Sequence, residues 1–188
     1  ESLVFINKQL GTNVMLSEDL LVSFTKIRET AGLTNEELMG IAHLSFTSKK
    51  NFKDITGEIL AQAKITSTLN GVVLNEKDIL KEVNNLSAAT TLSLGKNPSL
   101  LAEAVTQAKS LGMTMEQIDK ISESILNFES SLTSELKAEL LLGKNINLER
   151  ARLAALNNDM ATVASEIAAQ IGDTADFASM NRIQQKAL

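Results

Sequence analysis

Apolar side chains recur at steps of three and four residues along most of the chain, which is the spacing of an amphipathic α-helix. The longest such pattern begins after Thr114 and continues to Gly143. We therefore expect one helix over residues 115–142, ~42 Å long at the helical rise per residue. Its apolar positions are Ile118, Ile121, Ile125, Phe128, Leu132 and Leu136.

Start and stop signals divide the chain into further helices. Thr34–Glu37 and Thr114–Gln117 each match a capping box, in which two side chains satisfy two orphan backbone amides. Pro98 follows Asn97 at a first helical position, where its missing N–H costs nothing. The other expected caps are Ser17, Asn75, Asn147 and Asp159, and the expected stops are Gly32, Gly112, Gly143 and Gly172. The pattern predicts an all-α fold of about seven to eight helices joined by short turns.

The composition agrees with a helical fold and reduces the number of functions to consider. The chain has a single Pro and nine Gly in 188 residues, which favours helix throughout. Six Phe are its only aromatic residues. Compact cores and small-molecule pockets draw much of their buried area from aromatic rings. Slender helices are therefore expected rather than a wide core with a deep pocket.

Charge and cysteine content exclude several classes of function. The net charge of −5 gives no electrostatic attraction to nucleic acid or to anionic lipid. With no cysteine, the chain has no disulfide, thiolate nucleophile or cysteine-based zinc site. No apolar run approaches the roughly 18 residues of a membrane span.

The two ends of the sequence indicate a piece of a longer polypeptide. The chain begins at Glu1 without a Met, and it stops at "MNRIQQKAL" within a helical pattern. We expect a single helical region over 1–188. The Ser/Thr-rich stretch "SAATTLSLGKN" offers a subdivision into 1–95 and 96–188 as the alternative.

Recurring glutamates are the first candidate for chemistry. Glu129, Glu135, Glu139 and Glu149 follow one another through a leucine-rich stretch. A di-iron bundle requires Glu-x-x-His motifs, and the sequence contains none. A calcium loop of Asp, Asn and Gly at fixed spacing is also missing. We interpret these glutamates as the solvated face of a helix.

No other catalytic or cofactor motif is present. His43 is the only histidine, it has no evident nucleophile or orienting acid, and we place it at the edge of the core. The phosphate-loop pattern is absent, and Lys49–Lys50 is too little for a nucleic-acid surface. We expect no catalytic, cofactor or metal site, and therefore no enzyme. A glycan hydrolase is the enzymatic alternative, and the low aromatic content argues against it.

Interaction through helix faces is the function that remains. The stripe from Ile118 to Leu136 approximates a heptad seam that Glu135 interrupts. Two interpretations stay open, packing within the same chain and a homo-oligomeric helical bundle. The candidate contact residues are Ile118, Ile121, Ile125, Phe128, Leu132 and Leu136, with Met180 and Ile183 from the C-terminal segment.

Several long motifs resemble one protein family. They are "NFESS" at 127–131, "AELLLGKNINLERAR" at 138–152, "AALNND" at 154–159 and "MNRIQQKAL" at 180–188. Together they resemble segments of the tail tape-measure proteins of tailed bacteriophages, over most of residues 50–188. These motifs carry no known chemistry, so the resemblance transfers no catalytic residue.

The resemblance implies a structural virion component, made in the bacterial cytoplasm and placed in the tail lumen or at the tail tip. It implies roles in setting tail length, filling the tail tube and ejecting the genome. The implied partners are copies of the chain itself, the tail tube and baseplate or tail-tip proteins. Because the expected helices are short and capped, we expect a locally folded domain. A soluble non-enzymatic helical adaptor is the alternative.

Overall fold

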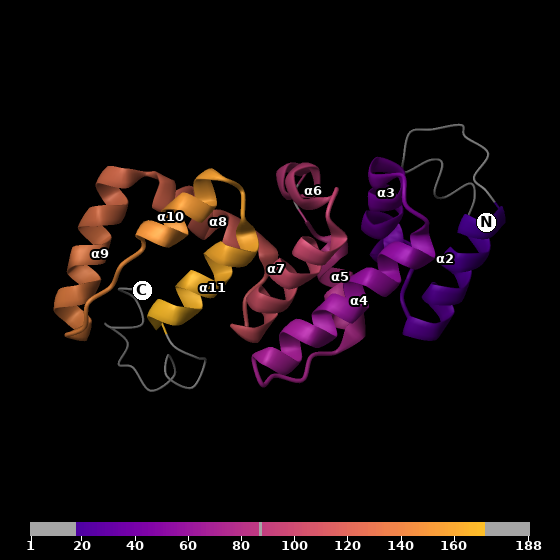
Figure 1. Cartoon of the computed structure of the whole chain (residues 1–188), viewed down its shortest axis with the longest axis horizontal. Coiled ribbons are helices and arrows are strands. Elements are labelled where there is room, and N and C mark those ends of the chain that lie inside the picture. The colour runs from indigo at the N-terminus through magenta and orange to yellow at the C-terminus, as the bar shows by residue number, and fades with distance from the viewer. Residues whose placement is uncertain (1–17, 87, 172–188) are drawn as a thin grey trace. The chain divides into compact units, whose positions relative to one another are not determined.

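The computed structural model describes residues 18–86 and 88–171, which form helices and turns with no strand among them (Figure 1). The predicted all-α class is thereby confirmed for this part of the chain. The described α-helices outnumber the seven or eight expected, in part because the stretch 115–142 forms two. The chain divides into two compact units, Glu1–Thr106 (unit 1) and Gln107–Leu188 (unit 2), with the boundary inside α7 (Pro98–Ser110).

Several of the predicted helix ends coincide with the observed ones. Thr114 and Gln117 form the expected reciprocal capping box at the start of α8 (Met115–Leu126). Asn75 accepts a hydrogen bond from Lys77 N and so caps α5 (Glu76–Asn84). Gly143 ends α9 (Phe128–Leu142) in the left-handed conformation, with φ of 66°. That conformation favours glycine because it has no Cβ. The expected cap at Ser17 and stop at Gly172 lie outside the described residues.

Unit 1 is built around α4 (Phe52–Leu69). This helix packs against α2 (Glu18–Ala31), α3 (Met39–Ser48) and α5. A 3₁₀ turn, η1 (Glu36–Leu38), contacts α3 and α5, and α6 (Ala88–Leu94) leads to α7. The largest side chains that unit 1 buries completely are apolar, and they are Phe24, Leu38, Ile41, Leu44, Phe52, Ile55, Ile59, Ile79, Leu80 and Leu101.

Gly40 allows α3 and α5 to approach closely. A Cβ added at this position would lie 2.6 Å from the Cα of Asn84, closer than real Cβ atoms come. The Gly40 N–H instead donates to the Asn84 side-chain oxygen at 2.7 Å. The glycine is thus required by the crossing of two helices and not by a turn.

Unit 2 holds the end of α7, then α8, α9, α10 (Glu149–Leu156) and α11 (Met160–Ile171). Helix α10 packs against α8 and α11, and α11 also packs against α8. Small side chains such as Ala151, Ala155 and Ala164 are buried in these contacts. They allow close helix approach but remove little apolar area from water.

Candidate functional site

Asn127 divides the expected long helix into α8 and α9. Its N–H donates to Ser124 O at 3.2 Å, and its side-chain oxygen accepts from Ser130 N at 3.4 Å. A backbone ψ of 86° at Asn127 lies outside the helical region, so the chain turns there. The single helix expected over 115–142 is therefore two, because an Asn side chain replaces a helical backbone bond with one of its own.

The predicted apolar stripe divides at the same residue. On α8, Ile118 and Ile125 are buried and Ile121 is half-buried, so this part of the stripe belongs to the core of unit 2. On α9 the later residues of the stripe, Phe128 onward, face away from that core. The six candidate contact residues from Ile118 to Leu136 therefore do not lie on one face of one helix, and Met180 and Ile183 lie outside the described residues.

Helix α9 exposes a row of large apolar side chains. Phe128 is 50% exposed, Leu132 49%, Leu136 61% and Leu140 85%. Residues four apart lie on one side of a helix, so these four form a continuous ridge, here called the α9 ridge. The sequence pattern identified its first three members, and Leu140 extends it by one turn.

The inner side of α9 is polar. Ser131 and Ala138 are its buried residues, and Glu135 and Glu139 are half-buried beside them. Amphipathic surface helices ordinarily turn the apolar side to the core and the charged side to water. In α9 this arrangement is inverted.

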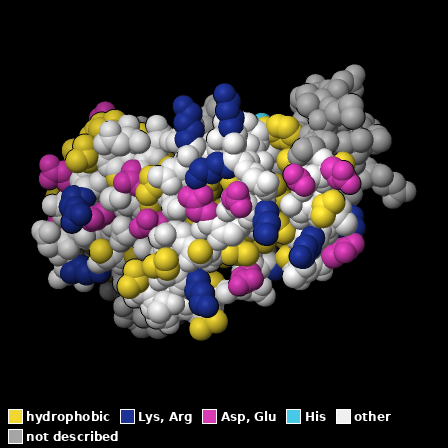
Figure 2. Space-filling model, turned by 45° about the vertical axis from the view of Figure 1, so that its right-hand side comes forward, with side chains coloured by type: hydrophobic (Ala, Val, Ile, Leu, Met, Phe, Trp, Pro, Cys, Tyr) yellow, Lys and Arg dark blue, Asp and Glu magenta, His cyan; other side chains and the backbone are white. Residues whose placement is uncertain are grey.

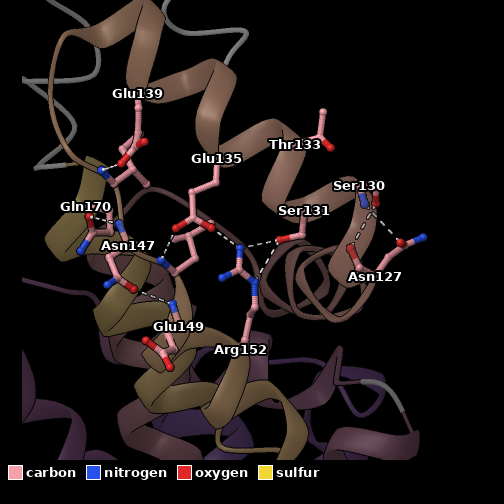
Figure 3. A network of polar contacts seen from close by, with 12 residues as sticks. Asn127, Ser130, Ser131, Thr133, Glu135, Glu139, Asn147, Glu149, Arg152 and Gln170 are labelled. Carbon is pink, nitrogen blue, oxygen red and sulfur yellow. Dashed lines mark hydrogen bonds and ion pairs between the residues drawn. The ribbon is translucent and has the colours of Figure 1, made fainter.

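Arg152 of α10 binds the inner side of α9 (Figure 3). Its Nε and Nη2 donate to Ser131 Oγ at 3.2 and 3.0 Å, and Nη2 also pairs with the Glu135 carboxylate. The other Glu135 oxygen accepts from Leu148 N at 3.1 Å, just before α10 begins. These contacts satisfy both charged groups, which burial otherwise disfavours.

A second carboxylate fixes the connection between α9 and α10. Glu139 accepts from Ile146 N at 2.9 Å, and in Figure 3 its side chain points toward that connection. The Lys144 ammonium donates to Gln170 O, and Asn147 N donates to the Gln170 side chain at 3.2 Å. The loop after α9 is thus held from both α9 and α11.

The interpretation of the glutamates as a solvated face is wrong for two of them. Glu135 and Glu139 point inward and bind α10 and its preceding loop, whereas Glu129 and Glu149 are exposed. The pattern alone could not show this because their partners lie far along the chain. No group of three or more potential metal ligands occurs among the described residues. His43 is exposed, not at the edge of the core.

Exposed apolar side chains also occur in unit 1, on α4 and in the loop after it. They are Ile65, Leu69 and Val73, and Val73 borders a shallow hollow of about 310 Å³ between α4 and α5. Figure 2 shows hydrophobic side chains in small groups among charged ones on one face of the molecule. Ile65 and Leu69 lie four residues apart and cover one turn at the end of α4, whereas the α9 ridge continues over about three turns. Short exposed apolar groups are normal, and the longer row indicates a contact surface.

No described helix has both the length and the apolar content to cross a membrane. Comparison of the chain with family models, with curated protein sequences and with solved structures finds no match. The inference of function therefore depends on the residues of the chain and on their geometry.

Proposed function

We propose that the chain is a structural, helix-mediated assembly module, a domain of the tail tape-measure protein of a phage or phage-derived particle. Within the parent protein it would help to set tail length, occupy the tube lumen and take part in genome ejection. Its partners would be further copies of the chain, tail-tube proteins and baseplate or tail-tip proteins. It would reside in the tail lumen or at the tail tip, and it would not act as an enzyme.

The α9 ridge is the observation that carries this proposal. A helix that turns Glu135 and Glu139 inward and Leu132, Leu136 and Leu140 outward exposes apolar area that association with another surface would remove from water. The inner network with Arg152 holds α9 in this orientation. The ridge is thus a fixed feature suited to helix–helix contact.

Two of the motifs that resemble tape-measure proteins supply the two ends of this surface, and Leu132 and Leu136 lie between them. "NFESS" supplies the cap Asn127, the ridge residue Phe128 and the buried Ser131. "AELLLGKNINLERAR" supplies Leu140 of the ridge and Arg152 of the network. The resemblance and the exposed surface therefore share Phe128, Leu140 and Arg152, and this overlap supports the proposal.

Two experiments test the proposal. Light scattering should give a mass that rises with concentration for the purified chain, and Leu132→Asp with Leu136→Asp should lower it to the monomer mass. Antibodies raised against the chain should label purified tails. A chain that stays monomeric at all concentrations would favour the adaptor alternative. Tails that the antibodies do not label would show that the chain is not a component of the virion.

A further inference from the structure

We propose that a second copy of this chain covers the α9 ridge with its own α9 helix, in antiparallel orientation. This inference rests on the proposed self-assembly and adds the contact surface and its direction. The argument uses the order of apolar and charged residues on the exposed side of α9.

The ridges of two copies match in size and position when the two helices run in opposite directions. With a two-fold axis between Leu132 and Leu136, each of these leucines lies opposite the other in the second copy. Phe128 then lies opposite Leu140 of the other copy, so the bulkiest member meets the most exposed one. Ridges of residues four apart are those that interdigitate in the commonest class of helix pairs.

Charge along the neighbouring row favours the antiparallel direction. Glu129, Thr133, Lys137 and Leu141 form this row, and all four are exposed. Glu129 and Lys137 have no ion-pair partner within the described residues. In the antiparallel pair Glu129 lies about 3 Å along the axis from Lys137 of the other copy, and symmetry forms this contact twice. In a parallel pair the two copies of this row would lie on opposite sides of the contact, so Glu129 and Lys137 would not meet each other and the charges would stay unpaired.

The size of the ridge predicts weak association. One face of a 15-residue helix buries less than the roughly 800 Å² per partner of a stable interface. The isolated chain should therefore associate at micromolar or higher concentration. In an assembly that holds many copies together, the effective concentration would be far higher and the contact would persist.

Because the chain contains no cysteine, introduced thiols report the contact directly. Glu129→Cys and Lys137→Cys variants are mixed and oxidised, and Ser134→Cys, exposed on α9 but off the ridge, is the control. We expect the yield of the mixed 129–137 disulfide to be at least tenfold higher than that of the 129–129 and 137–137 disulfides. It should exceed the yield of the Ser134→Cys control by the same factor. Glu129→Lys should weaken association about tenfold, and Glu129→Lys with Lys137→Glu should restore it.

Three outcomes would overturn the inference. Like disulfides, 129–129 and 137–137, as frequent as the mixed one would contradict the antiparallel direction. Association by light scattering with no cross-link above the control would place the contact on another surface, and the proposed self-assembly would survive. An intramolecular disulfide in Leu140→Cys/Met180→Cys would show that the C-terminal segment of the same chain covers the ridge. A chain that never associates would instead contradict the proposed function itself.

Discussion

Arg152 and Glu135 form an ion pair between α10 and α9 in which only 8% of the arginine side chain and 12% of the glutamate side chain are exposed. A charge pair so far removed from water is costly to form and far more costly to break on one side. It determines which side of α9 faces inward, and therefore which side is left for association.

Arg152→Met should destabilise unit 2 by about 3–5 kcal/mol, because the Glu135 carboxylate would stay buried without its partner. The measurement is urea denaturation followed by circular dichroism. Lys120→Met is the matched control: Lys120 pairs with Glu116 at 2.6 Å, and with side chains 69% and 71% exposed the loss of this pair should change stability little. Equal costs for the two variants would contradict the structural role of the Arg152 pair.

Asn127→Ala should lower the free energy of unfolding by about 1 kcal/mol, because the first turn of α9 would lose its side-chain cap. Asn145→Ala, at an exposed position of the loop after α9, is the control and should change little. Denaturation midpoints of the two variants provide the comparison. If Asn127→Ala leaves stability unchanged, the cap does not maintain the break between α8 and α9.

Helix ends were the part of the fold that the sequence predicted best. Thr114, Asn75 and Gly143 act through bonds to residues two to four positions away, so a local pattern contains the whole cause. Asn127 was missed because Phe128 and Leu132 continue the helical spacing across it. An Asn followed by "FES", three acceptable first-turn residues, was the signal that could have located the break.

The orientation of α9 could not be predicted from the pattern. Periodicity shows that a helix has an apolar side and a polar side, but not which one meets the rest of the unit. In α9 that choice depends on Arg152, which lies 17 residues from Glu135 and 21 from Ser131. Sequence reasoning therefore found three of the four ridge residues and assigned Glu135 and Glu139 to the wrong side.

Gly40→Ala and Gly57→Ala form a matched pair in unit 1. A Cβ at Gly40 would press on the Asn84 backbone, so this variant should cost about 1–3 kcal/mol. A Cβ at Gly57, inside α4, meets nothing within 4 Å and should stabilise the helix by about 0.5–1 kcal/mol. Thermal unfolding of the two variants should shift in opposite directions. A shift in the same direction would contradict the close crossing of α3 and α5.

Acid should destabilise unit 1 through Glu58. The hydrogen bond from Lys50 at 2.8 Å, and a further one from Ser99, lower the pKa of this carboxyl below 4.5. A lowered pKa in the folded state stabilises the fold above the unfolded pKa, and this stabilisation is lost as pH falls through the folded value. Denaturation between pH 6 and pH 3 should show a shallower decline for Glu58→Gln than for the unaltered chain. Lys50→Met should reduce the decline similarly, and an unchanged decline in both would contradict this role.

Light scattering across a concentration series tests most directly whether the α9 ridge mediates self-association. The unaltered chain and Ser134→Asp should both show a mass that rises above the monomer value. Leu132→Asp/Leu136→Asp should stay at the monomer mass while keeping its helical circular dichroism, because both leucines are exposed in the single chain. Equal association of the double variant and the unaltered chain would contradict the account.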